Sequence, residues 1–241
     1  QSEWTGSKID RWFWDFGDPN SVYDTTSARN PAYRYDRPGI YNTLLTVTNV
    51  LGCTDTTSHP LTVHNLPEAN FSYSLACQNN HTLFNDLTET GDTTIGQWWW
   101  RFSYSLNMLG LAGVQNPHFV FKNTGTYNVE LIVVDNFGCR DTASTTLVVN
   151  PKPISAFSLT ENYENTQGRV LFNNGSIGAT AYEWDFSTGI QSFEIEPVVD
   201  FPGDGTYAVT LVTINEFGCP DTLKVDYSLM FKGLWVPNAF S

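Results

Sequence analysis

One pattern of residues occurs three times in this chain, always in the same order. Each copy contains Trp-x-Phe, a residue followed by Pro, an aromatic residue, Gly-x-Tyr, a Leu and finally Gly-Cys-x-Asp-Thr. The copies are marked by Trp14, Trp100 and Trp184, which are 86 and 84 residues apart. Solenoid repeats are shorter, at about 20–50 residues, whereas a segment of this length can bury a core of its own. The chain is therefore expected to be an array of three related domains.

Each copy has the pattern of short β-strands. In Trp-x-Phe the two aromatic residues lie two positions apart, so both face the same side of a strand. The segments 127–133 and 207–211 alternate in the same way and are rich in β-branched residues. Gly-containing hairpin turns follow them. Seven short strands around a central Trp predict an all-β fold of tandem immunoglobulin-like β-sandwiches arranged end to end.

Two proline-containing linkers, at 64–67 and 150–153, divide the chain. Proline restricts the backbone of such segments, so limited bending is expected between consecutive domains. The first repeat has only 13 residues before Trp14, so its first two strands are expected to be missing, and the chain is expected to be a piece of a longer protein. The predicted boundaries are 1–65, 66–151 with an insertion at 103–115, 152–230, and the start of a further domain at 231–241.

The charge of the chain excludes one class of partner. The formal net charge is −13 and the isoelectric point is about 4.5. A nucleic-acid-binding protein needs basic groups to neutralise phosphates, so no nucleic-acid partner is expected. No apolar run approaches the roughly 18–20 residues that a membrane-spanning helix requires.

The aromatic pair of each repeat is predicted to lie between two sheets. Truncation of a buried Trp costs about 3–5 kcal/mol, a large part of the stability of a small domain. The predicted core pairs are Trp14 with Phe16, Trp100 with Phe102, and Trp184 with Phe186.

The second repeat contains an unusually apolar insertion. By strand alternation Trp99 faces outward, because Trp100 is the core residue. The insertion that follows carries Leu106, Met108, Leu109 and Leu111, where the first repeat has a polar loop. A loop this apolar is unusual in water. It is expected either to fold onto its own domain or, together with Trp99, to contact a partner.

The sequence contains no recognisable catalytic motif. The four histidines (His59, His64, His81 and His118) are scattered, and neither His-Glu-x-x-His, Gly-x-Ser-x-Gly nor Cys-x-x-Cys occurs. The chain is therefore predicted not to be an enzyme, and no cofactor is expected. Asp15 and Asp18 are candidate Ca²⁺ ligands, since this cation prefers carboxylates. The favoured alternative is that both accept hydrogen bonds from turn amides.

The four cysteines allow three pairings, and exported proteins hold disulfides rather than free thiols. Cys77 follows the first strand of the second repeat, whereas Cys53, Cys139 and Cys219 lie at hairpins between the last two strands. These places are at opposite ends of a sandwich, about 20 Å apart for a six-residue strand, and a disulfide needs Cα atoms within about 7 Å. Cys77 is therefore expected to pair with Cys219 across the junction of two repeats. A short first strand, or one that switches sheets, would instead bring Cys77 to Cys139.

These landmarks resemble the PKD (polycystic kidney disease) repeat. The resemblance rests on Trp-Asp-Phe-Gly-Asp at 14–18, Asn-Pro at 30–31, Gly-x-Tyr at 39–41 and their recurrence in order. The second repeat departs by having Arg101 in place of the Asp, and the third has Ser187-Thr188 in place of Gly-Asp. The ending Gly-Cys-x-Asp-Thr is similar to that of large surface proteins of gliding and related Bacteroidota. The tail 234–241 resembles the opening of a type B C-terminal sorting domain of type IX secretion.

The resemblance implies a non-catalytic stalk or adhesion array of a large surface-exposed protein. It implies export by type IX secretion, with the outer-membrane machinery as a partner through the adjoining sorting domain, and a location at the cell surface, attached to the outer membrane. Surface glycans or other cell-surface proteins are further expected partners. The alternative is that these are glycan-binding or spacer modules of a secreted polysaccharide-degrading enzyme. Asp-Thr sequences resemble the O-glycosylation pattern of exported proteins in this phylum, although ordinary strand chemistry also explains them. The candidate acceptors are Thr25, Thr56, Thr93, Thr142 and Thr222.

Overall fold

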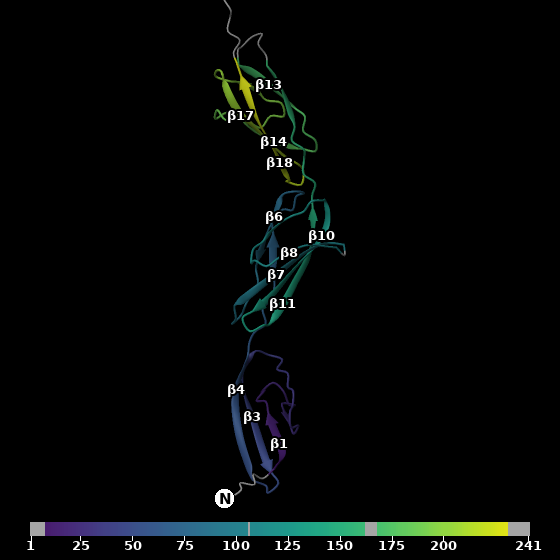
Figure 1. The fold of residues 1–241 in the computed structure, drawn as a ribbon, viewed down its shortest axis with the longest axis vertical. Helices are drawn as coiled ribbons and strands as arrows, with labels where there is room; N and C mark the ends of the chain where they lie inside the picture. The colour runs from purple at the N-terminus through teal and green to yellow at the C-terminus, as the bar shows by residue number, and fades with distance from the viewer. Residues whose placement is uncertain (1–7, 106, 162–167, 231–241) are drawn as a thin grey trace, which may run out of the picture. The chain divides into compact units, whose positions relative to one another are not determined.

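The computed structural model describes residues 8–105, 107–161 and 168–230, and these form an all-β protein without any helix (Figure 1). The chain forms two compact units. The first comprises Gln1–Asn70, Thr88–Trp98 and Ile132–Thr142, and the second comprises Phe71–Leu87, Trp99–Leu131 and Ala143–Ser241. The second repeat thus contributes to both units.

The first repeat forms one four-stranded antiparallel sheet in the order β2-β1-β3-β4. Within the described part of this repeat there is no second sheet. Its strands are β1 (Ile9–Asp15), β2 (Thr25–Thr26), β3 (Gly39–Asn49) and β4 (Thr54–Val63).

The second repeat contains two sheets, in the orders β11-β10-β7-β8 and β5-β6-β9. The two sheets form a β-sandwich. Along β10 and β11 the more buried side chains alternate with the more exposed ones, as expected for strands with one face toward the core. Its strands are β5 (Phe71–Tyr73), β6 (His81–Asp86), β7 (Ile95–Tyr104), β8 (Asn107–Ala112), β9 (His118–Val120), β10 (Gly125–Asp135) and β11 (Arg140–Val149).

The third repeat has the same plan, with sheets in the orders β15-β14-β17-β18 and β12-β13-β16. Its strands are β12 (Phe157–Glu161), β13 (Arg169–Asn174), β14 (Ala181–Asp185), β15 (Gln191–Ser192), β16 (Val198–Asp200), β17 (Gly205–Ile214) and β18 (Pro220–Leu229). The all-β, tandem β-sandwich fold predicted from the sequence is confirmed in these repeats.

The aromatic pairs of the second and third repeats lie in the two sandwich cores. Trp100, Phe102, Trp184 and Phe186 are all buried. In the third repeat Phe172 of the facing sheet lies 5.6 Å from the Trp184 ring and 4.9 Å from the Phe186 ring. Phe84 makes the equivalent contacts with Trp100 and Phe102. The first repeat differs, since Phe16 is buried but Trp14 is only half-buried and its Nε1 has no hydrogen-bond partner among the described residues. The reason is that the described residues of this repeat supply no facing sheet.

The Gly-x-Tyr motif closes one corner of each repeat. The hydroxyl groups of Tyr41, Tyr127 and Tyr207 each donate a hydrogen bond to the backbone carbonyl four residues earlier, at 2.8, 2.7 and 2.8 Å. This is the tyrosine corner of immunoglobulin-like sandwiches. The motif therefore has a structural role in all three repeats.

The Gly-Cys motif fixes an identical hairpin in each repeat. An Asn or Asp side chain accepts hydrogen bonds from the amides two and four residues later, and the second of these amides belongs to the Cys. The Gly before the Cys has a φ of +83° to +88°, which L side chains rarely adopt. Cys53, Cys139 and Cys219 therefore have equivalent places.

Candidate inter-repeat joints and binding surfaces

A disulfide links the second repeat to the third. Cys77 and Cys219 are joined with Sγ atoms 2.01 Å apart and Cα atoms 5.6 Å apart, and both are buried. This is the pairing favoured by the positions of the turn and the hairpin in the sequence. Cys53 and Cys139 are free thiols in the structure, so the alternative partner of Cys77 is unpaired.

Hydrogen bonds surround this disulfide. Asn80 Nδ2 donates to the carbonyl of Pro220 at 3.3 Å, directly beside Cys219. Asn215 Nδ2 donates to the carbonyl of Pro151 in the linker at 2.7 Å. The linker is thus held to the same hairpin that carries the disulfide.

The Asp of the Gly-Cys-x-Asp-Thr motif completes the joint. Asp221 accepts hydrogen bonds from Lys152 Nζ at 2.7 Å and from the Ser155 amide at 2.8 Å. Burial by itself would raise the pKa of Asp221, but the hydrogen bonds from Lys152 and Ser155 lower it on balance. In the second repeat Asp141 accepts from the Ala69 amide at 2.7 Å in the same manner. The Asp therefore ties the start of its own repeat to the hairpin.

The linker between the first and second repeats has a different, noncovalent arrangement. His64 Nδ1 lies 3.0 Å from an Asp92 oxygen, and the His64 ring stacks on Phe137 with centroids 3.9 Å apart. The Asn65 amide and side chain both donate to the other Asp92 oxygen. The hydrogen bond from His64, followed by those from Asn65, lowers the pKa of Asp92 from 3.8 to about 2.

This linker is expected to be sensitive to acid. The pKa of the Asp92 carboxylate is lower in the folded chain than in the unfolded chain. The stability that its hydrogen bonds give to the linker is therefore complete above about pH 3.9 and is lost as the pH falls through about 2. Titration of the Asn65 amide by NMR between pH 5 and 1.5 should show a transition near pH 2. Asp92→Asn should abolish that transition. A midpoint near 3.8, or an unchanged transition in the variant, would contradict the assignment.

The apolar insertion of the second repeat forms strand β8, at the edge of the sheet and paired with β7. The backbone of the insertion thus folds onto its own domain, which is the first of the two alternatives expected from the sequence. Gly110 and Ala112 pair with the buried Phe102 and Trp100. A Cβ at Gly110 would lie 2.6 Å from Phe119 Cε2, so there is no room for a larger residue. Met108, Leu109 and Leu111 are exposed, and Leu106 lies outside the described residues.

Substitutions in β8 should separate its two roles. The triple variant Met108→Ser, Leu109→Ser, Leu111→Ser is expected to change the free energy of unfolding by less than about 1.5 kcal/mol, because these side chains lie outside the core. Gly110→Val, by contrast, should cost about 1–3 kcal/mol through the clash with Phe119. Denaturant titration followed by circular dichroism measures both. A large loss in the triple variant would show that the exposed side chains support the fold.

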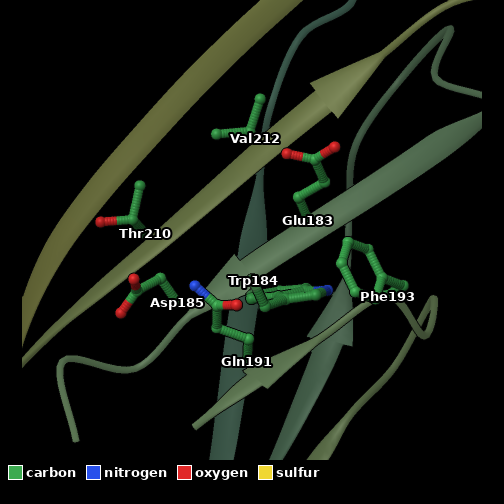
Figure 2. Close-up of a pocket in the computed structure, with 7 residues that line it drawn as sticks. All are labelled: Glu183, Trp184, Asp185, Gln191, Phe193, Thr210 and Val212. Atoms are coloured by element: carbon green, nitrogen blue, oxygen red, sulfur yellow. The ribbon is translucent and has the colours of Figure 1, made fainter. Parts of the chain in front are cut away.

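The third repeat carries a shallow groove of about 300 Å³ on the outer face of its four-stranded sheet. Figure 2 shows the residues that border it. They are Glu183 and Asp185 of β14, Thr210 and Val212 of β17, Gln191 of β15, and Phe193, which directly follows β15. The register places Asp185 between Gln191 and Thr210. Trp184 Nε1 donates to the Glu194 carbonyl at 3.0 Å and so anchors the segment that presents Phe193. This groove could not be predicted from the sequence, because β15 has only two residues and therefore no periodic strand pattern.

The structure assigns local roles to the two candidate Ca²⁺ ligands. Asp15 accepts a hydrogen bond from the Gly17 amide, and Asp18 accepts from the Asn20 amide and from the Tyr33 hydroxyl. These are the turn interactions of the alternative interpretation. In the part of the chain that is described, no three His, Cys, Asp or Glu residues gather into a group that could hold a metal ion.

The candidate acceptor threonines differ in accessibility. Four of them have exposed side chains, namely Thr25, Thr56, Thr142 and Thr222. Thr93 is buried and its hydroxyl donates to the Thr90 carbonyl at 2.9 Å. The hydroxyl of Thr93 is therefore the least accessible of the five in the folded chain, and modification at all five sites stays a prediction.

The comparisons with known proteins agree with a β-sandwich array. A family model described as PKD domain matches residues 1–63. The mouse (Mus musculus) dyslexia-associated protein KIAA0319-like protein is 29% identical over 204 residues, which is 74% of this chain and 19% of that protein. The chain therefore spans about a fifth of the length of this curated relative. No helix in the described residues is long and apolar enough to cross a membrane.

Solved structures show similarity at low sequence identity. The PKD1 domain of the Vibrio cholerae metalloprotease PrtV is 22% identical, with 36% of this chain and 99% of that chain covered and a TM-score of 0.32. A bacterial ice-binding adhesin structure is 11% identical, with 93% and 86% covered and a TM-score of 0.36. The family match covers the first repeat, and the sheets of the second and third repeats are those of tandem β-sandwich domains.

Proposed function

We propose that this chain is a non-catalytic spacer and adhesion array of PKD-like modules within a cell-surface protein. The observation that carries the proposal is the buried Cys77–Cys219 disulfide, which joins two sandwich domains where a linker would otherwise bend. Catalysis does not need such a bond, whereas a spacer gains stiffness from it. The Asn215–Pro151 hydrogen bond, which holds the linker to the hairpin of Cys219, serves the same purpose.

The proposed boundaries of the modules are 1–65, 66–151 and 152–230, with a further domain starting at 231. The sheets support this division, because each proposed module contains its own four-stranded sheet with the central Trp strand in the same place. Limited proteolysis of the native protein should cut at the module borders more readily after reduction. Cleavage within β10 or β17 at the same rate would contradict the division.

We propose further that the full-length protein leaves the cell through type IX secretion and is held at the outer membrane. The resemblance of residues 234–241 to a sorting domain supports this proposal, although those residues lie outside the described part of the chain. The test is proteinase K accessibility of the full-length protein on intact cells. The protein should be cleaved in cells with a working secretion system and protected in cells that lack the outer-membrane pore. Equal protection in both strains would contradict surface exposure.

The second candidate function is that of an accessory array on a polysaccharide-degrading enzyme. The specific observation in its favour is the outward-facing Trp99 ring, which is 52% exposed. Both functions require the same modules, and they differ in what the full-length protein carries besides them. Assay of that protein for release of reducing sugar from polysaccharides distinguishes the two, since a spacer and adhesion protein releases none.

A further inference from the structure

Each of the three repeats carries a groove between the strand of its central Trp and the neighbouring edge strand. The groove of the third repeat was described above. The first repeat has one of about 480 Å³, bordered by Arg11, Phe13, Ser27 and Arg29 among others. The second has one of about 230 Å³, bordered by Trp99, Leu111 and Gly113 among others.

The strand registers establish that two lining positions are equivalent in the three grooves. The central Trp of each repeat pairs with the last residue of the edge strand, namely Trp14 with Thr26, Trp100 with Ala112, and Trp184 with Ser192. One wall of each groove is therefore the residue before the Trp, and the other is the residue after its edge-strand partner. The two walls are Phe13 and Ser27, Trp99 and Gly113, and Glu183 and Phe193.

Every groove contains one exposed aromatic ring from these two positions. In the first and second repeats the residue before the Trp supplies it, and the opposite wall is small. In the third repeat that residue is Glu183, and the ring comes from the opposite wall as Phe193 (Figure 2). The rings of Phe13, Trp99 and Phe193 are 46%, 52% and 73% exposed. The aromatic ring thus comes from one wall in two grooves and from the opposite wall in the third. Because its position differs while its presence does not, packing of either strand does not explain it.

The charges of the grooves indicate what the rings contact. The first groove contains Arg11 and Arg29 together with Asp10, which lies 3.5 Å from Arg11, so its charged lining is on balance positive. The second groove has no charged side chain on its walls. The third contains Glu183 and Asp185, which form no ion pair among the described residues. A charged ligand favoured by one groove would be opposed by another. A ligand common to all three is therefore uncharged and has a flat apolar face.

We propose that the three grooves are subsites for the sugar rings of an uncharged polysaccharide. A pyranose has an apolar C–H face that stacks on an aromatic ring and hydroxyl groups at its edges. In the third groove Asp185, Gln191 and Thr210 offer hydrogen-bond acceptors and donors to such hydroxyls. This inference specifies the ligand class for the adhesion part of the proposed function and rests on it.

A polymer suits shallow, separate subsites better than a protein partner does. A stable protein interface buries roughly 800 Å² on each side around an apolar centre, whereas these grooves each offer a single ring. One sugar ring in one groove would bind weakly. Sugar units far apart along one polymer can bind the grooves of different modules, which raises the apparent affinity above that of a single groove where the polymer spans the sites.

The test uses the full chain, in its oxidised form, and affinity electrophoresis in gels that contain a polysaccharide. The probes are β-glucan, mannan and xylan as uncharged polymers, with alginate as an acidic and chitosan as a basic polymer. Phe13→Ala, Trp99→Ala and Phe193→Ala are made singly and together. Tyr23→Ala is the matched control, because its ring is 86% exposed and lies on the wall of none of these grooves.

Binding to at least one uncharged polymer is expected, with each single variant weakened by about 2- to 10-fold, the range expected for one aromatic stacking contact. The triple variant should lose more than the product of the single effects, and Tyr23→Ala should bind as the unaltered chain does. Retention by alginate or chitosan alone, no retention by any polymer, or an equal loss in Tyr23→Ala would overturn the proposal. Capture of a surface protein in place of a polymer would also overturn it. The effect of reduction on the joint is independent of these results, so the spacer role is judged separately.

Discussion

Trp184→Ala is expected to lower the free energy of unfolding of the third repeat by about 3–5 kcal/mol. The side chain is only 2% exposed and its ring packs against the rings of Phe172 and Phe186. Its removal leaves a cavity and also leaves the Glu194 carbonyl without the indole donor. Because several domains are present, a single two-state fit is not valid. Hydrogen exchange of the Val209 and Leu211 amides, which lie in the same core, measures the loss within this repeat.

Two other tryptophans provide matched controls for this prediction. Trp99→Ala removes an outward-facing ring and should change stability by about 0.5 kcal/mol or less. The loss of stability in Trp14→Ala should lie between those of Trp99→Ala and Trp184→Ala, because the Trp14 side chain is half-buried and no facing sheet covers it in the described residues. The burial argument fails if Trp99→Ala costs as much as Trp184→Ala.

Removal of the Cys77–Cys219 disulfide is expected to have the second large effect. The double variant Cys77→Ser, Cys219→Ser should lose about 2–5 kcal/mol of stability in the joined repeats, the usual cost of losing a native disulfide. The double variant is preferable to a single one, which leaves a buried unpaired thiol. Calorimetry should show one shared transition for the second and third repeats in the oxidised chain and two separate transitions in the variant.

The free cysteines supply the control for this experiment. Cys53→Ser, Cys139→Ser removes two thiols from equivalent hairpins but breaks no bond. Its melting profile should match that of the unaltered chain. If this control changes the profile as much as the disulfide variant does, the effect comes from the hairpins and not from the crosslink.

Several features of the fold follow from residue spacing alone. Trp-x-Phe places two rings on one strand face, and the structure buries both rings in the second and third repeats. The pairing of Cys77 with Cys219 is favoured over Cys77 with Cys139 because a first turn and a last hairpin lie at opposite ends of a sandwich. These inferences succeed because strand alternation and strand length are geometric properties of the backbone.

Other features depend on packing that spacing does not encode. The insertion of the second repeat looks like a loop, yet Gly110 and Ala112 let it pair closely with β7 over Phe119. The grooves arise from edge strands as short as two residues, which carry no periodic signal. Phe193 can be matched to Ser27 and Gly113 only when the register is known. Thr93 has the same sequence pattern as the exposed threonines but lies in a turn that buries its hydroxyl.

The most direct test of the proposed spacer role is whether the second and third repeats move as one body. Residual dipolar couplings of backbone amides, measured in a weakly aligned sample, report the orientation of each repeat independently. The oxidised chain should fit a single alignment tensor for amides of β6 and β10 together with those of β13 and β17. After reduction, or in Cys77→Ser, Cys219→Ser, the two repeats should need separate tensors of different magnitude. Two separate tensors in the oxidised chain would show that the disulfide does not stiffen the joint and would contradict the account.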